Sequence, residues 1–285
     1  MTADGMRPDI VELTSFYESR DGEYARRLIN HQLRQIWPDL AQKDLLGIGF
    51  ATPFLGIFDE ARSQIALMPA TQGARAWPPD GRSRVALGRE DELPFEDRSF
   101  DNIILAHAFE CSPHASRLMR EVWRVLADGG RLLVIAPNRR GLWCWSERTP
   151  FGFGQPYTSD QLERSLKNNL FTVGETRRAL YMPPLGRFFS RGRRFVLKLS
   201  VPMERIGLKA LPHFSGVLIT EAIKEVYSPT PEFALARPGS RRYVPVPEGV
   251  MARGKTRSLV LHRDPADDEP ALRRPRPAPR QRRSR

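Results

Sequence analysis

The chain has 285 residues, 40% of them hydrophobic, which is enough for one large α/β domain with additions or for two small domains. It contains no run of eighteen apolar residues, which excludes a membrane-spanning helix, and its start, MTADGMRPDI, lacks the apolar core of a secretory signal. Cys111 and Cys144 have no Cys or His neighbour at metal-ligand spacing. We therefore expect a cytoplasmic protein with neither a metal site nor a disulfide scaffold.

The net charge of +12 is concentrated in two segments. The tail 271–285 contains seven arginines and no acid, and the segment 187–211 contains seven basic residues and one acid, so the rest of the chain is close to neutral. The tail has no aromatic residues for stacking on bases, so we expect no nucleic-acid partner. The segment 187–211 has three open roles: an amphipathic helix packed on the body, a surface for an anionic membrane, or a docking face for a protein partner.

The first forty residues predict a helical cap. Apolar residues recur at helical spacing between 25 and 36, and Pro38 ends the pattern. At the other end, residues 264–285 are rich in Pro, Arg and acids, with few apolar side chains. That composition predicts a disordered basic tail.

From residue 44 onward, apolar strands alternate with amphipathic helices. Strands are expected at 44–50, 63–69, 83–88, 101–108, 131–137, 171–182 and 216–227, and helices at 53–63, 112–127 and 159–170. Thr158 and Gln161 form a capping-box pattern at the start of the last of these helices. This alternation predicts an α/β fold with a mostly parallel sheet covered by helices on both faces.

Three segments carry a resemblance to a known family. They are LLGIGFATPF from residue 45, ELPFEDRSFDNIILAHAFE from residue 92 and LMREVWRVLADGGRLLVIAPN from residue 118. In this order they resemble the glycine-rich loop, the fourth strand and the fifth strand of class I S-adenosylmethionine-dependent methyltransferases, in the small-molecule branch called type 11. The resemblance implies a Rossmann-like, seven-stranded sheet with an antiparallel last strand, in a domain spanning 41–263, and a substrate-specific insertion at 184–213.

The turn after the first strand is the expected cofactor loop. Gly47 and Gly49 would let backbone N–H groups approach a ligand, and the less favoured alternative is that they only allow close packing of a helix on a strand. The resemblance implies that S-adenosylmethionine contacts this loop. The implied contact residues are Gly47, Gly49, Phe50, Ala51 and Thr52.

This loop departs from the family pattern. The family usually has an acid at the position of Gly47 and glycines at Ala51 and Pro53, and here Phe50 either lines the pocket or occupies it. The acid that normally ends the second strand and accepts hydrogen bonds from the ribose has no counterpart near Met68 or Pro69. Each missing hydrogen bond weakens cofactor binding by about 1–3 kcal/mol.

Two further positions belong to the expected site. After the third strand the resemblance implies an acid that binds the adenine amino group; Arg89 stands at the usual position, and the adjacent Glu90 and Asp91 take this role or else form a solvated acidic turn. At the end of the fourth strand, His107 is expected to contact the cofactor or to take a proton from the substrate as the catalytic residue, unless it only hydrogen-bonds to the backbone. Glu110 follows His107 toward the same crevice.

Two functions follow from these patterns. The first is an S-adenosylmethionine-dependent methyltransferase that acts on an unidentified small or lipophilic acceptor. The second is a non-catalytic protein that keeps the fold and acts as a binding or assembly factor through its basic insertion. The missing acids favour the second, whereas the strand motifs and the crevice histidine favour the first.

Overall fold

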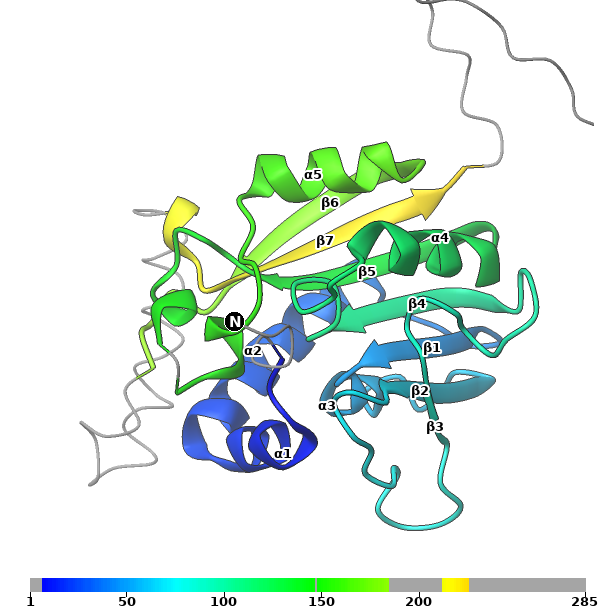
Figure 1. Ribbon diagram of the computed structural model, residues 1–285, viewed down its shortest axis with the longest axis horizontal. Coiled ribbons are helices and arrows are strands. Elements are labelled where there is room, and N and C mark those ends of the chain that lie inside the picture. Colours follow the sequence, from blue (N-terminus) through cyan, green and yellow to red (C-terminus); the bar gives the residue numbers. More distant parts are fainter. Residues whose placement is uncertain (1–6, 147, 185–211, 226–285) are drawn as a thin grey trace, which may run out of the picture. The chain divides into compact units, whose positions relative to one another are not determined.

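The protein is described by a computed structural model, which covers residues 7–146, 148–184 and 212–225 (Figure 1). Within these residues, seven strands form one sheet in the order β3-β2-β1-β4-β5-β7-β6. The strands are β1 (Asp44–Gly49), β2 (Ser63–Pro69), β3 (Val85–Gly88), β4 (Phe100–Ala106), β5 (Leu126–Pro137), β6 (Phe171–Ala179) and β7 (Val217–Lys224). All neighbouring strands from β3 to β5 are parallel, and β7 is antiparallel to both β5 and β6. The predicted Rossmann-like sheet with an antiparallel last strand is confirmed.

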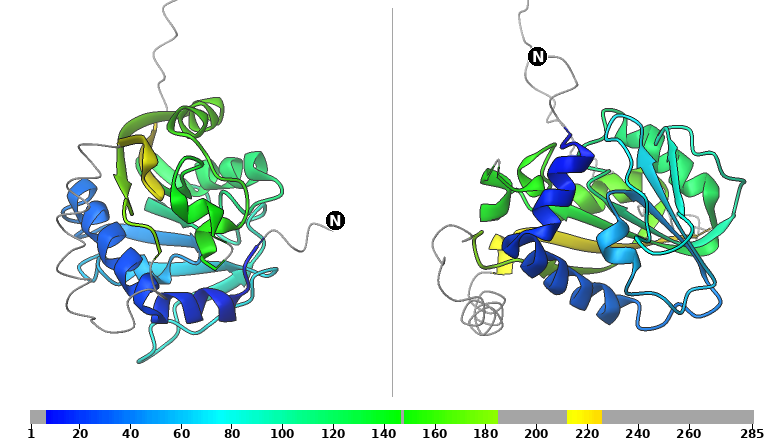
Figure 2. Two further views of the ribbon diagram at one scale, coloured as in Figure 1. Left: turned by 90° about the vertical axis from the view of Figure 1, so that its left-hand side faces the viewer. Right: turned by 90° about the horizontal axis from the view of Figure 1, so that it is seen from below.

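Helices cover both faces of the sheet (Figures 1 and 2). The helices are α1 (Ile10–Glu18), α2 (Arg20–Ile36), α3 (Thr52–Leu55), α4 (Ala115–Val125) and α5 (Ser159–Asn168), with short 3-10 turns η2 (Leu142–Trp145), η3 (Pro150–Gly152) and η4 (Pro212–Phe214). One apolar core joins α1, α2 and α3 to the sheet, and the other joins α4 and α5 to its opposite face. The strands β1, β4 and β5 all end on the side where α1, η2 and η3 gather.

The structure corrects two of the expected helices. The predicted N-terminal helix is two helices, because Ser19 breaks the first and caps the second by accepting a hydrogen bond from the Gly22 N–H at 3.2 Å. The helix predicted at 53–63 is wrong beyond Leu55, since Gly56 ends it and successive turns follow. The capping box of Thr158 and Gln161 is confirmed.

Several predictions concern residues outside the described part of the chain. The insertion at 184–213 falls almost entirely outside it, as does the basic tail 264–285. Among the residues that are described, no helix combines the length and the apolar character needed to cross a membrane.

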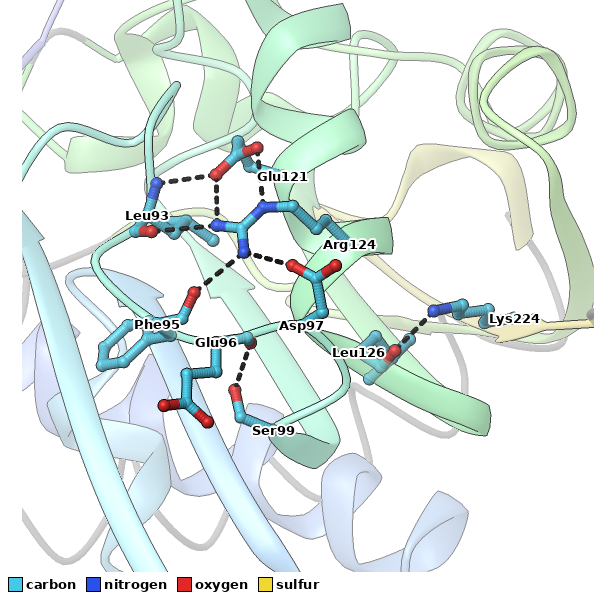
Figure 3. Close-up of polar contacts among 9 residues, drawn as sticks. All are labelled: Leu93, Phe95, Glu96, Asp97, Ser99, Glu121, Arg124, Leu126 and Lys224. Carbon is cyan, nitrogen blue, oxygen red and sulfur yellow. Dashed lines mark hydrogen bonds and ion pairs between the residues drawn. The ribbon is translucent and has the colours of Figure 1, made fainter.

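Arg124 on α4 is hydrogen-bonded to the loop between β3 and β4 (Figure 3). Its guanidinium donates to the carbonyl oxygens of Leu93 at 2.9 Å and Phe95 at 2.8 Å, and to the carboxylates of Asp97 at 2.8 Å and Glu121 at 2.7 Å. The hydrogen bond from Arg124 is the main cause that lowers the pKa of the Glu121 carboxyl, and the Leu93 N–H, which donates to the same carboxylate at 2.9 Å, lowers it further. Arg124 and Glu121 of α4 thus hold the loop between β3 and β4 by one cluster of charged hydrogen bonds.

We predict that Arg124→Met lowers the free energy of unfolding by about 1–3 kcal/mol, because two carbonyls and two carboxylates lose their donor. Urea denaturation measures the loss. Arg120→Met is the matched control, since Arg120 is exposed on the same helix and should change stability little. Equal effects of the two substitutions would contradict a stabilising role for this cluster.

Arg34 on α2 holds the turns after α3. It pairs with Glu60 at 2.6 Å and also donates to the carbonyl of Ile57. The Arg34 hydrogen bond is the main cause that lowers the pKa of Glu60 from 4.5 to about 2. The folded state therefore favours the ionised carboxylate more than the unfolded chain does.

A carboxyl whose pKa falls on folding stabilises the folded state above its unfolded pKa, and this contribution disappears as pH falls through the folded pKa. We expect Glu60→Gln to be less stable than the wild type at pH 7, with the difference shrinking between pH 4.5 and pH 2. Urea midpoints measured across that range test this. Asp80→Asn, at an exposed aspartate, serves as the control and should show no such change. A gap for Glu60→Gln that is constant with pH would contradict the prediction.

Candidate functional site

The ends of β1 and β4 approach each other closely at the carboxyl edge of the sheet. Gly49 pairs with Ala106 and has a positive φ of 86°, and a Cβ on Gly49 would lie 2.2 Å from the Ala106 carbonyl oxygen. The Phe50 N–H donates to this oxygen at 2.8 Å. Glycine is therefore required at position 49 by the backbone conformation and by the contact with β4.

Gly47 has a packing role as well. A Cβ at this position would lie 2.7 Å from the Ala51 Cβ and 2.9 Å from Leu55 Cδ1, so its absence lets α3 pack on β1. Thr52 begins α3, and Ala51 is fully buried beneath it. The close packing of a helix on a strand that the sequence left open therefore accounts for Gly47, whereas Gly49 is required by its backbone conformation and its contact with β4.

Phe50 forms part of an aromatic wall. Its ring lies 5.6 Å from the ring of Tyr17 on α1, and the Tyr17 ring stands edge-on to Phe54 at 5.7 Å. Phe50 is 5% exposed, so α1 covers the turn after β1. This ring therefore belongs to the wall between β1 and α1.

His107 is the centre of a buried polar group. It follows β4 with a positive φ of 52°, and its Nε2 lies 2.7 Å from the hydroxyl of Tyr17. On the other side of the ring, Nδ1 lies 3.4 Å from Glu110 Oε1, and both residues are 2% exposed. Burial, followed by the charge of Glu110, raises the pKa of Tyr17 well above its usual value. The structure thus aligns Glu110, His107 and Tyr17.

Several buried polar atoms at this edge have no hydrogen-bond partner among the described residues. They are Arg7 Nη1, both amide atoms of Gln72, His107 Nδ1 and both carboxylate oxygens of Glu110. Buried polar groups in native proteins are normally paired, so unpaired ones mark a place where a polar ligand or water binds. This donor and acceptor set fits a cofactor that carries hydroxyl, amino and carboxylate groups.

Gln72 was missed by the sequence analysis. It lies three residues after β2, it is 2% exposed, and its carbonyl oxygen accepts a hydrogen bond from the Ile10 N–H at 2.9 Å. The family pattern has an acid at the end of β2, whereas this chain has the Gln72 amide, which also accepts hydrogen bonds from hydroxyl groups. A polar residue soon after a buried strand was the available signal.

Glu90 and Asp91 line a cavity of about 330 Å³ at the ends of β2 and β3. The cavity is bounded by 69–71, 88–91 and 112–114. Glu90 pairs with Arg7 at 2.6 Å, and Asp91 pairs with Arg89 at 3.0 Å, which lowers the pKa of Asp91. The two acids therefore share a cavity that Gly47, Gly49 and His107 do not line, and Arg7 connects Glu90 to the N-terminal segment.

Part of the chain is similar to known methyltransferases. The family described as "Methyltransferase domain", type 11, matches residues 63–134. Phthiotriol/phenolphthiotriol dimycocerosates methyltransferase 1 of Mycobacterium ulcerans is 52% identical over 46 residues, which are 16% of this chain and 17% of that protein. The mitochondrial 2-methoxy-6-polyprenyl-1,4-benzoquinol methylase of Mus musculus is 29% identical over 132 residues, which cover 42% of this chain and 37% of that protein.

Residues 63–134 thus match the type 11 methyltransferase domain, and they contain β2, β3, β4 and α4 together with most of β5. A methyltransferase from the complex with the Trm112 methyltransferase activator of Haloferax volcanii has the same fold, with a TM-score of 0.51, 14% identity, and coverage of 75% of this chain and 98% of that chain. The two sequence matches span only 17% and 37% of the relatives' own lengths, so they describe the shared domain and not the whole proteins.

We predict that Gly49→Ala lowers the free energy of unfolding by at least about 2 kcal/mol, because the added methyl group meets the Ala106 carbonyl in a left-handed backbone. Thermal or urea denaturation measures the effect. Gly56→Ala is the matched control, since nothing lies within 4 Å of its Cβ position. If Gly49→Ala were as stable as Gly56→Ala, the close approach of β1 and β4 would be refuted.

Proposed function

We propose that the protein is an S-adenosylmethionine-dependent methyltransferase that acts on a small or lipophilic acceptor. The observation that carries this proposal is the concentration of unpaired buried polar atoms at the carboxyl edge, beside a cavity at the ends of β2 and β3. Ligands of parallel α/β sheets bind at this edge, where the strand order reverses. In this sheet the order reverses between β1 and β4.

Residues of the chain are proposed to contact three parts of the cofactor. Glu90 and Asp91 are proposed to face the adenine, and the amide of Gln72 is proposed to bind the ribose hydroxyls. The rings of Phe50 and Tyr17 provide aromatic faces, which attract a cation such as a sulfonium. When bound, S-adenosylmethionine supplies an electrophilic methyl group.

Gly47, Gly49, Ala51 and Thr52 are proposed to act by shaping the turn that holds Phe50. Residues 1–40 are proposed to act as a cap, since α1 covers Phe50 and His107 and would have to move for ligands to enter. Transfer of a methyl group depends mainly on alignment and on exclusion of water, which a closing cap provides. His107 is proposed as the catalytic residue.

The alternative function is a binding or assembly factor without catalysis. It rested on the basic insertion at 184–213, almost all of which lies outside the described residues. The relatives named as methyltransferases do not favour it. A protein or anionic membrane partner for 187–211 stays a prediction.

We expect the protein to bind S-adenosylhomocysteine with a micromolar Kd in isothermal titration calorimetry. Ala70→Trp should weaken binding at least tenfold, because Ala70 is exposed and lines the proposed adenine cavity. Ala74→Trp, at an exposed alanine that does not line this cavity, is the matched control and should leave Kd unchanged. Absence of binding by the wild type at millimolar ligand would contradict the methyltransferase proposal.

A further inference from the structure

The hydroxyl of Tyr17 is the group that His107 binds in this structure. The two atoms are 2.7 Å apart, and Tyr17 comes from α1, 90 residues away in the sequence. Tyr17 is 8% exposed and His107 is 2% exposed, so water has little access to this contact. A buried phenol thus lies where a substrate of a histidine base would present its proton.

Glu110 lies on the other side of the His107 ring. Its Oε1 lies 3.4 Å from His107 Nδ1, on the side of the ring opposite to Tyr17. These two atoms make no hydrogen bond, so Glu110 acts on the ring as a nearby charge and is a positioning residue behind it. In the tautomer that carries its proton on Nδ1, Nε2 accepts a hydrogen bond from the Tyr17 hydroxyl.

The side chains around this contact are mostly aromatic. The Tyr17 ring lies 5.0 Å from Phe16, 5.6 Å from Phe50 and 5.7 Å from Phe54. His107 itself is covered by Phe151, whose ring centre lies 5.1 Å away. Aromatic pairs at such distances contribute specific attraction beyond the burial of apolar area. Aromatic rings and one imidazole nitrogen therefore surround the phenol of Tyr17.

We infer that Tyr17 takes the place of the methyl acceptor, and that the acceptor is an aromatic compound whose hydroxyl group replaces the Tyr17 hydroxyl on His107 when α1 moves aside. This inference rests on the proposed function. A phenol suits an imidazole base, because its proton is far more acidic than that of an aliphatic alcohol; the ordinary pKa values of phenol and imidazole are about 10 and 6.5.

The proposed reaction transfers a methyl group to the oxygen of the phenol. The acceptor oxygen forms a bond to the methyl carbon, and the electron pair of the broken sulfur–carbon bond stays on the sulfur of the methyl donor, S-adenosylmethionine. The proton of the phenol passes to His107 Nε2, and Glu110 stabilises the imidazolium that results. The products are an aryl methyl ether and S-adenosylhomocysteine.

Calorimetry on the full chain without cofactor tests the inference. The probes are 4-butylphenol, 4-butylanisole, which lacks the hydroxyl proton, and 4-butylcyclohexanol, which lacks the aromatic ring. We expect 4-butylphenol to bind at least tenfold more tightly than the other two. Tyr17→Phe should bind it several-fold more tightly than the wild type does, because His107 loses its internal donor. Tyr157→Phe is the control, since Tyr157 packs against the other core, and should bind as the wild type does.

A second measurement keeps the two proposals separate. With S-adenosylmethionine present, mass spectrometry should detect methylation of 4-butylphenol and none of 4-butylcyclohexanol or 4-butylaniline. Equal binding of the three calorimetric probes, or methylation of the amine or the alcohol in preference to the phenol, would overturn the inference while leaving the methyltransferase intact. Failure of the wild type to bind S-adenosylhomocysteine would instead refute the proposed function.

Discussion

The carboxyl edge of this protein depends on the close approach of β1 and β4. Gly49 and Ala106 are so near that no side chain fits between them, and His107 leaves β4 in a left-handed conformation. These two constraints turn Phe50 and His107 toward the same space. Helix α1 then closes over that space through Tyr17, which contacts both residues. The geometry of the site is therefore set by the backbone of two strands, and the N-terminal segment completes it.

The turn after β1 lacks the acids and the additional glycines that are usual in the family. In their place, this chain has an apolar turn packed under α3 and an aromatic ring facing α1. Buried polar atoms without a hydrogen-bond partner among the described residues come from elsewhere: Gln72 after β2, Glu110 after β4 and Arg7 before α1. Their unpaired atoms surround the covered edge, so the loss of the usual acids does not leave the crevice without hydrogen-bonding groups.

The sequence predicted the sheet well because its apolar strands and turn residues are local signals. It also placed His107 and Glu110 at one edge, since parallel strands end together. It could not foresee that Tyr17 pairs with His107, because this contact joins residues 90 positions apart through tertiary packing. Gln72 was missed because the search followed a family pattern of acids, and the helix after Pro53 was overextended because apolar spacing continues past Gly56, where the chain turns.

The most direct test of this account is a crystal structure of the protein with S-adenosylhomocysteine and 4-butylphenol. The account predicts that the adenine lies in the cavity bounded by Pro69, Gly88 and Ser112, that Gln72 binds the ribose, and that Tyr17 has left His107. If S-adenosylhomocysteine were absent from the carboxyl edge or bound elsewhere, with Tyr17 still hydrogen-bonded to His107, the covered edge would be a structural core and not a methyl-transfer site.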